Sequence, residues 1–291
     1  MSSFPEPAEV RASTAGPNQG DDLEPLGRPR TSSRLILGMR VDATHYETAT
    51  DQILRWAAQG QSRYICVAAV NNVMHSYDDP TFRDAMNGAD LVTPDGMPLV
   101  WGLRRLGVTD ATRVYGPDLT PLLLAAAERE AIPVGFLGSA PHVLAMLLDE
   151  VDRRWPALRV AYAWSPPFTA LTDEEDADVV SAINASGAKI LFVGLGCPKQ
   201  ELWMARHRGT VEGVMVGVGA AFDFLAGEKL QAPQAMQEAG LEWLFRLITE
   251  PRRLAKRYLR QNPRFAVLFG AQLIRFRAGG ASQRGSRARA F

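Results

Sequence analysis

The chain carries, at positions 191 to 201, the stretch Leu191-Phe-Val-Gly-Leu-Gly-Cys-Pro-Lys-Gln-Glu201. Its first residues form a short apolar run, which is typical of a strand buried on both faces. Two glycines then permit a tight turn, and Lys199, Gln200 and Glu201 open an amphipathic stretch with a cation, an amide and a carboxylate. In open α/β sheets, ligands bind at the carboxyl ends of the strands. The stretch therefore favours a ligand-facing turn over a plain strand–helix turn.

The same alternation of apolar runs and amphipathic stretches recurs along the chain. Strands this apolar, separated by helices, predict an α/β fold with a Rossmann-like, mostly parallel sheet and helices on both faces. The expected strands are 35–37, 64–70, 91–93, 134–137, 160–162, 190–193 and 214–218. The expected helices are 46–58, 80–87, 97–106, 118–130, 141–154, 173–186 and 199–207.

After Gly227 the pattern becomes entirely helical. One apolar face is formed by Leu241, Leu244, Phe245 and Ile248. Pro251 and Pro263 each suit the first turn of a further helix. The apolar segment 265–276 is too short to span a membrane, so it predicts an interfacial, oligomeric or core helix.

Composition divides the chain into four expected parts. Residues 1–34 and the basic residues 278–291 have too few apolar groups to offset the entropy of ordering, which predicts disordered tails. Between them we expect a catalytic α/β domain at 35–228 and a C-terminal helical basic appendage at 229–277. The amino terminus lacks the apolar core of a signal peptide, and no run of about 18 apolar residues occurs, which favours a cytoplasmic protein. Cys66 and Cys197 lie far apart, which excludes a disulfide scaffold.

The formal net charge of zero hides an uneven distribution of charge. Residues 241–291 carry twelve Lys/Arg and two Asp/Glu, a balance of +10. The rest of the chain has 20 basic groups (32 − 12) and 30 acidic groups (32 − 2), a balance of −10. This split indicates that the C-terminal residues face an anionic partner, which could be a phosphate, a diphosphate, a nucleic acid or a membrane surface.

Further strand ends could carry chemistry. Asp95, in Pro94-Asp-Gly96, could act as a general base, although spacing alone favours an ordinary turn. Gly138 and Ser139 precede a helix whose first N–H groups could cradle a phosphate as readily as close a plain turn. Asp223 lies in an apolar setting, which favours a structural role.

Other templates of catalytic and binding sites are absent or weak. Asp176-Ala-Asp178 is the only D-x-D, a metal-binding pattern of many sugar-nucleotide enzymes, but its acidic surroundings favour a solvated helix start. The four histidines show no metal-ligand spacing. Two classes of protein stay open at this point. One is a nucleotide-binding Rossmann-like enzyme of another kind, and the other is a non-enzymatic binding module that uses the basic tail. Residues 64–72 show no dinucleotide fingerprint, and the tail has no recognised nucleic-acid motif.

Several motifs occur in one order between about residues 35 and 258. They are Val70-Asn-Asn72, Asp79-Pro-Thr-Phe-Arg-Asp-Ala-Met86, Ala89-Asp-Leu-Val-Thr-Pro-Asp-Gly96, Arg113-Val-Tyr-Gly-Pro-Asp-Leu119, Gly135-Phe-Leu-Gly138, Gly194-Leu-Gly-Cys-Pro-Lys-Gln-Glu201, Gly217-Val-Gly-Ala-Ala-Phe-Asp-Phe-Leu-Ala-Gly227 and Gly240-Leu-Glu-Trp-Leu-Phe-Arg-Leu247, followed by Glu250-Pro-Arg-Arg253. This ordered set resembles the WecG/TagA/CpsF glycosyltransferases (glycosyltransferase family 26). Ala69 and Gln231 depart from it, since many members carry Thr and Arg there.

The resemblance implies an inverting transferase that needs no metal or other cofactor. It would move a sugar, of the N-acetylmannosamine type or another hexose, from a UDP-sugar to an undecaprenyl-diphosphate-linked saccharide. The products would be exopolysaccharide, teichoic acid or common antigen. The enzyme would be cytoplasmic and peripheral on the inner face of the plasma membrane, with an anionic membrane surface as partner and no nucleic acid. Homo-oligomerisation is left open.

The resemblance also implies roles for particular residues. Asp95 falls on the proposed catalytic base. The donor-binding residues would be Asn71, Gly96, Gly138, Ser139, Gly196, Lys199, Gln200 and Glu201. The residues that bind the acceptor diphosphate would be Arg246, Arg252, Arg253 and Arg257. The remaining positive charge, from Arg260 through Arg289, would hold the enzyme to anionic lipid.

Overall fold

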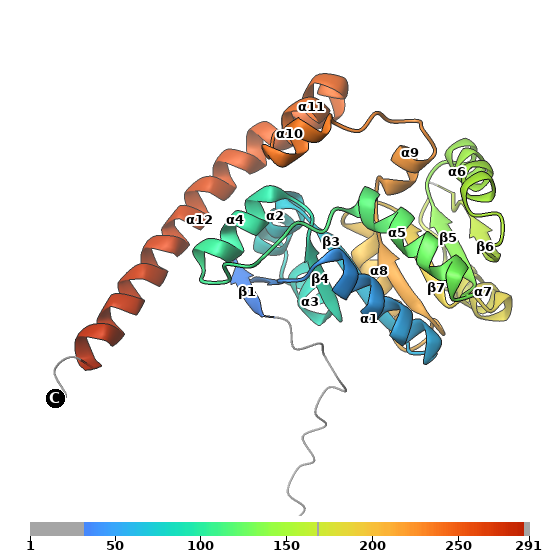
Figure 1. The fold of residues 1–291 in the computed structure, drawn as a ribbon, viewed down its shortest axis with the longest axis horizontal. Coiled ribbons are helices and arrows are strands. Elements are labelled where there is room, and N and C mark those ends of the chain that lie inside the picture. Colours follow the sequence, from blue (N-terminus) through green and yellow to red (C-terminus); the bar gives the residue numbers. More distant parts are fainter. Residues whose placement is uncertain (1–31, 168, 288–291) are drawn as a thin grey trace, which may run out of the picture.

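The computed structural model describes residues 32–167 and 169–287. At its centre is a six-stranded parallel sheet with the order β4-β3-β8-β7-β5-β6 (Figure 1). The strands are β3 (Arg63–Ala68), β4 (Leu91–Pro94), β5 (Val134–Gly138), β6 (Val160–Trp164), β7 (Ile190–Gly194) and β8 (Val214–Gly217). The predicted α/β fold with a mostly parallel sheet is therefore confirmed.

Helices cover both faces of this sheet. One face packs against α1 (Tyr46–Ala58), α5 (Gly116–Arg129), α6 (Pro141–Arg154) and α9 (Ala221–Leu225). The other packs against α2 (Val70–Asp78), α3 (Pro80–Gly88), α4 (Met97–Arg105), α7 (Asp173–Ser186) and α8 (Lys199–His207). Successive side chains of a strand point to opposite faces, so Phe192 joins the first core and Val193 the second.

The structure differs from the predicted elements on both sides of β3, the first strand of the parallel sheet along the chain. Residues 35–37 were expected to form a single strand, but β1 (Ser33–Ile36) and β2 (Met39–Asp42) make an antiparallel hairpin. Its two turn residues have φ values of 51° and 89°, as a tight hairpin turn requires. Ser33 and Arg34 thus belong to β1 and not to the expected tail, of which residues 1–31 lie outside the described residues.

The second difference is α2, which replaces the end of the expected strand 64–70. β3 ends at Ala68, and the Asn72 side chain accepts a hydrogen bond of 3.0 Å from the Ala69 N–H. This bond satisfies a backbone donor at the start of α2, which begins at Val70. Val70 is β-branched and suits a strand equally well, so the local pattern did not reveal the helix.

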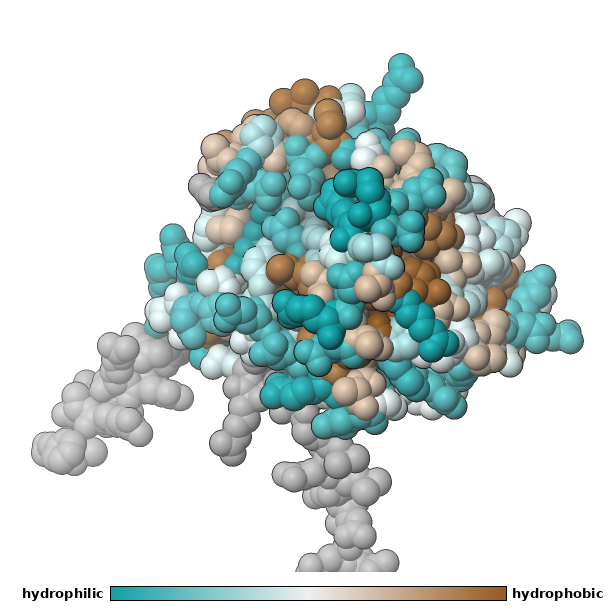
Figure 2. Space-filling view, turned by 45° about the vertical axis from the view of Figure 1, so that its right-hand side comes forward, coloured by the Kyte–Doolittle hydropathy of each residue, from teal (hydrophilic) through white to brown (hydrophobic). Residues whose placement is uncertain are grey.

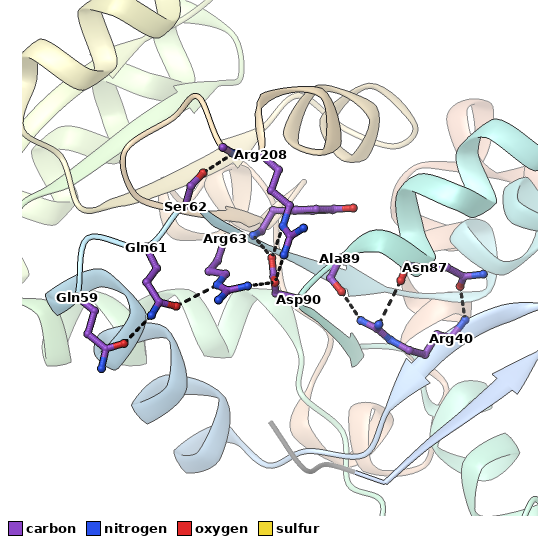
Figure 3. Close-up of polar contacts among 11 residues, drawn as sticks. Arg40, Gln59, Gln61, Ser62, Arg63, Asn87, Ala89, Asp90 and Arg208 are labelled. Carbon is purple, nitrogen blue, oxygen red and sulfur yellow. Dashed lines mark hydrogen bonds and ion pairs between the residues drawn. The ribbon is translucent and has the colours of Figure 1, made fainter. Parts of the chain in front are cut away.

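A buried carboxylate holds the amino ends of the central strands together (Figure 3). Asp90 accepts hydrogen bonds from Arg63 at 2.8 Å, from the Tyr64 N–H at 3.1 Å and from Arg208 at 2.7 and 3.1 Å. Asp90 directly precedes β4, and its donors come from the start of β3 and from Arg208 at the end of α8. The cluster lies at the end of the sheet opposite to the strands' carboxyl ends, which favours a structural role.

The C-terminal appendage consists of α10 (Gln234–Glu238), α11 (Glu242–Thr249) and α12 (Pro251–Arg287). Figure 1 shows α12 running diagonally past α2 and α4. The expectation of a separate helix from Pro263 is wrong, because Pro263 lies inside α12. Tertiary contacts on both sides of Pro263 hold the helix together: Leu254, Phe265 and Phe269 are buried, and Arg264 pairs with Asp78 on α2 at 2.5 Å.

The appendage continues further than expected. Residues 278–291 were expected to be a disordered tail, but α12 extends through Arg287, since helical hydrogen bonding propagates cooperatively from a docked segment. Residues 288–291 lie outside the described residues. None of the described helices is long and apolar enough to cross a membrane. Figure 2 shows a mostly hydrophilic face with brown apolar patches at its top and centre.

Candidate functional site

A cavity of about 570 Å³ lies between the carboxyl ends of β3 and β4 and the appendage. The α/β body, residues 35–228, contributes residues that follow β3 and β4, and the appendage contributes residues of α11 and α12. The polar residues that line the cavity are Asn71, Asp95, Arg113, Gln237, Glu242, Arg246, Arg257, Tyr258, Gln261 and Asn262. Its walls therefore come from segments separated by more than a hundred residues of sequence.

Asp95 directly follows β4 and points into this cavity. Its N–H donates a 2.8 Å hydrogen bond to the Ala68 carbonyl, which ties it to the end of β3. The side chain is 23% exposed, but its Oδ1 atom is buried and makes no hydrogen bond. Burial raises the pKa of Asp95 to about 7; Arg113 opposes the rise, Glu242 reinforces it and Arg246 opposes it. A carboxylate with such a pKa is suited to accept a proton near neutral pH.

Arg113 connects Asp95 to the appendage. Its Nε donates to the Asp95 carbonyl at 2.6 Å, and its Nη2 donates to Glu242 of α11 and lies 4.0 Å from Asp95 Oδ1. The guanidinium also stacks on Tyr115, with 4.0 Å to the ring centroid. The segment is held beside β4 because the Val114 N–H donates to the Pro94 carbonyl at 3.0 Å.

Several side-chain polar atoms in and beside the cavity are buried and make no hydrogen bond within the described residues. They are Asn71 Oδ1, Asp95 Oδ1, Tyr115 OH, Arg246 Nε and Arg257 Nε. Burying an unpaired polar group costs free energy, so several of them in one place indicate that a polar ligand completes the site. Two of the five are cationic, and they suit an anionic group on that ligand.

The donor residues expected from the sequence fall into two groups. Asn71, the second residue of α2, and Gly96, which precedes α4, line the cavity. The other six lie at the ends of β5 and β7 and are not among the residues that line it: Gly138, Ser139, Gly196, Lys199, Gln200 and Glu201. A hydrogen bond of 2.9 Å from Asn72 to Glu201 joins the two groups.

The ends of β5 and β7 approach each other closely at Gly138. Its φ is +126°, and a Cβ there would lie 2.5 Å from the Gly194 carbonyl carbon. Ser139 follows with a φ of +64°, and its N–H donates to the Gly194 carbonyl at 3.1 Å. The turn is therefore built by glycine at both strands, where one backbone approaches the other; the prediction that these turns approach a ligand stays a prediction.

Glu201 is a second buried carboxyl group, at the start of α8. Its Oε1 accepts hydrogen bonds from Asn72 at 2.9 Å and from Gln200 at 3.1 Å. Burial raises the pKa of Glu201 to about 7 even though these donors oppose the rise. Lys199, in contrast, is exposed.

The four arginines expected at the acceptor diphosphate also separate. Arg246 of α11 and Arg257 of α12 line the cavity. Arg252 and Arg253 are exposed and do not line it, and Arg253 pairs with Glu250 at 2.6 Å. The resemblance was therefore an incomplete guide, because Arg253 and Arg257 lie on the same helix, α12, and only Arg257 lines the cavity.

Sequence reasoning gave no role to Arg113, Tyr115 or Glu242. Arg113 and Tyr115 stand in the motif Arg113-Val-Tyr-Gly-Pro-Asp-Leu119, and that motif was the available signal. Glu242 appeared only as one of two acidic residues in a basic segment. Arg113 and Tyr115 are held near Asp95 by the pairing of their segment with the end of β4, whereas the proximity of Glu242 depends on the docking of α11.

The D-x-D pattern has a structural explanation. Asp176 accepts a hydrogen bond of 2.8 Å from Trp203 and pairs with His207 at 2.9 Å, which ties α7 to α8. Among the described residues, no group of three or more His, Cys, Asp or Glu side chains could hold a metal ion. Asp223 pairs with Lys229 at 3.1 Å.

A model of a known protein family matches most of the chain. The model of the glycosyl transferase WecG/TagA/CpsF family matches residues 34–279, which include the sheet, the cavity and most of the appendage. The chain belongs to this family and is a hexosyltransferase enzyme. Membership implies transfer of a sugar from a UDP-sugar to a lipid-linked acceptor in the synthesis of surface polysaccharides.

Proposed function

Because the chain is a WecG/TagA/CpsF glycosyltransferase, we propose that it transfers an N-acetylmannosamine-type sugar or another hexose to an undecaprenyl-diphosphate-linked saccharide, with inversion at the anomeric carbon. The observation that supports this best is Asp95, whose Oδ1 is unpaired in a cavity that the appendage lines with Arg246 and Arg257. We further propose that residues 35–228 form the catalytic domain and residues 229–277 the acceptor-binding appendage.

In the proposed reaction, Asp95 removes the proton from the acceptor hydroxyl. The resulting oxygen attacks the anomeric carbon of the donor, and the bond to UDP breaks on the opposite face. A pKa near 7 suits this role, because the carboxylate is then both sufficiently ionised and sufficiently basic at neutral pH. UDP leaves as an anion and needs positive partners.

Positive character near the cavity comes from two sources. The N–H groups at the starts of α2 and α4 lie beside Asn71 and Gly96, and helix N-termini favour anions. Arg246 and Arg257 add formal charge from the appendage. We propose that the donor lies along the ends of β3, β5 and β7, from Asn71 to Gln200, with the acceptor diphosphate at the arginines. Arg252 and Arg253 would reach it only from outside the cavity.

We also propose that the appendage meets an anionic membrane surface on the cytoplasmic side. Leu259, Val267 and Ile274 are each more than two-thirds exposed along α12. Arg260, Arg275 and Arg277 are exposed on the same helix. Exposed apolar side chains flanked by arginines suit the interface of an anionic bilayer.

Asp95→Asn tests the proposed base. It should lower kcat by about 10²–10⁴-fold, the usual contribution of a general base, while the melting temperature stays within the error of the wild type. Transfer is measured by the mass of the product, from UDP-N-acetylmannosamine, its uronic acid and UDP-glucose to a short-chain diphosphate-linked acceptor. Asp110→Asn, at an exposed position, is the matched control. Near-wild-type turnover in Asp95→Asn would refute the assignment.

A further inference from the structure

Two carboxylates compete for one nitrogen of Arg113. The Nη2 atom donates a hydrogen bond to Glu242 Oε2 and stands 4.0 Å from Asp95 Oδ1, too far for a hydrogen bond. The Nε atom is already used by the Asp95 carbonyl. In this arrangement Glu242 holds the guanidinium, and Asp95 Oδ1 is left without a donor.

The two competing carboxylates belong to different parts of the molecule. Asp95 is held by the end of the sheet, but Glu242 is the first residue of α11. No residue of α11 is fully buried, and Leu241, Trp243 and Ile248 beside or within it are exposed. Few buried apolar contacts mean a low free energy of local detachment. The partner that keeps Arg113 away from Asp95 is thus carried by a weakly packed element.

The other charged groups around Asp95 do not replace Glu242. Tyr115 and Arg113 come from the segment beside β4, and Arg246 and Arg257 come from the appendage. Glu242 is the second carboxylate among the residues that line the cavity. If α11 moves away, Arg246 leaves with it, and Arg113 is the cation that remains beside Asp95. Its Nη2 can then close on Oδ1 and occupy the atom that must accept the substrate proton.

We propose that Glu242 is a positioning residue that draws the Arg113 guanidinium away from Asp95, so that the carboxylate is a competent base only when α11 lies on the catalytic body. This inference rests on the proposed role of Asp95 as the base. It adds a regulatory consequence. Docking of the appendage brings the acceptor-facing arginines to the cavity, and the same event frees Asp95 Oδ1 to accept a proton. Proton removal is then coupled to the presence of the element that meets the acceptor.

The test is the dependence of kcat on pH in Glu242→Gln. In the wild type, activity should rise with pH through a midpoint near the Asp95 pKa of about 7, because the base must be ionised. Loss of the Glu242 charge removes a direct repulsion that raises the Asp95 pKa and also lets Arg113 pair with Asp95, so the midpoint should move to lower pH by about one unit or more. Only the pairing also occupies Oδ1, so a lowered midpoint with an unchanged plateau would refute it. The plateau should fall roughly tenfold, less than the about 10²–10⁴-fold loss expected on removing the base.

Two further variants keep the result interpretable. Glu242→Asp retains a carboxylate and should restore the wild-type midpoint at least in part. Glu228→Gln removes an exposed carboxylate near the appendage and should change neither midpoint nor plateau. A melting curve of each variant identifies loss of folding, and the position of the midpoint is independent of how much protein is folded.

The outcomes separate this inference from the proposed function. If Asp95→Asn is inactive but Glu242→Gln keeps the wild-type midpoint, the competition for Arg113 is refuted and the base assignment stands. The same holds if Glu242→Gln lowers the plateau without moving the midpoint, since that marks a purely structural role. If Asp95→Asn stays active with an unchanged profile, the base assignment fails and the inference fails with it.

Discussion

Asp95 and Glu201 show how burial, more than residue type, sets the chemistry of this site. Each follows a strand end, and each has its pKa raised to about 7 chiefly by loss of water. Their surroundings differ. Glu201 Oε1 accepts two side-chain hydrogen bonds, and Glu201, whose Oε2 is unpaired, does not line the cavity, whereas the unpaired Asp95 Oδ1 belongs to a residue that does. Glu201 is therefore held in place inside the body, and Asp95 is available to a substrate.

Glu201→Gln should remove a pH-dependent loss of stability. A raised carboxyl pKa means that the folded state binds the proton more tightly. The stabilisation is therefore complete below the ordinary value of 4.5 and is lost as the pH rises through about 7. The amide substitution should leave the free energy of unfolding similar near about pH 5 and raise it near about pH 8, by about 1.4 kcal/mol per unit of pKa shift.

Denaturant titrations at the two pH values measure this difference. Asn72 and Gln200 can still donate to the amide oxygen, so no hydrogen bond to Oε1 need be lost. Glu212→Gln, at an exposed position, serves as the control and should show no such difference. An equal effect of Glu201→Gln at both pH values would contradict the assigned pKa.

At the scale of elements, α12 is held by a small number of buried groups. Phe265 and Phe269 stack with 5.5 Å between ring centroids, and Phe269 packs against Gly102 of α4. Gln272 accepts from the Leu37 N–H at 2.9 Å and donates to the Leu35 carbonyl at 2.6 Å, which joins α12 to the β1–β2 hairpin. These contacts explain why one helix continues through Pro263 despite the lost hydrogen bond.

Phe269→Ala should loosen α12 from the body. Truncation of a buried phenylalanine costs about 3–5 kcal/mol, so hydrogen exchange and protease cleavage within α12 should increase strongly. Val267→Ala, two residues away and 73% exposed in the wild type, should leave both unchanged. Equal protection of α12 in the two variants would show that the phenylalanine does not anchor the helix.

Local sequence patterns predicted some elements well and others poorly. The helices at 46–58, 141–154, 173–186 and 199–207 occur with the expected bounds. Two of them have clear start signals, since Thr172 caps α7 and Pro141 occupies the first turn of α6. α2 and the continuation of α12 through Pro263 were missed. In both cases the local preference of one residue, Val70 or Pro263, is overridden by tertiary contacts that no short window of sequence contains.

At the scale of the whole molecule, the charge split acquires a spatial meaning. The +10 balance of residues 241–291 is carried by α11, α12 and the residues that follow. Arg246 and Arg257 face the cavity, whereas Arg260, Arg275 and Arg277 are exposed on α12. The excess positive charge therefore has two locations, one lining the cavity and one on the outer surface of α12.

Replacing Arg260, Arg275 and Arg277 together by Gln should weaken binding to vesicles with anionic lipid. The loss should be about 1 kcal/mol per residue at low salt and smaller at high salt, because the attraction is screened. Transfer to a short-chain acceptor in solution should be unchanged, since none of the three lines the cavity. Co-sedimentation and product mass measure the two effects.

The matched control replaces exposed arginines of the catalytic body, Arg105, Arg129 and Arg159, by Gln. It removes the same formal charge but should affect vesicle binding less. If both triple variants lose the same affinity, the membrane contact is not specific to the appendage.

The parallel sheet, the helices on its two faces, the placement of Asp95 at a strand end and the concentration of arginine near the C-terminus all follow from the order of residues. They do so because apolar period, turn residues and charge counts are local properties. The cavity itself is different, since Glu242 lies 129 positions from Arg113 along the chain, although Arg113 already contacts Asp95 within the body. Only the docking of α11 and α12 brings Glu242 to this pair and closes the cavity beside Asp95, and no local pattern of sequence contains a contact between such distant segments.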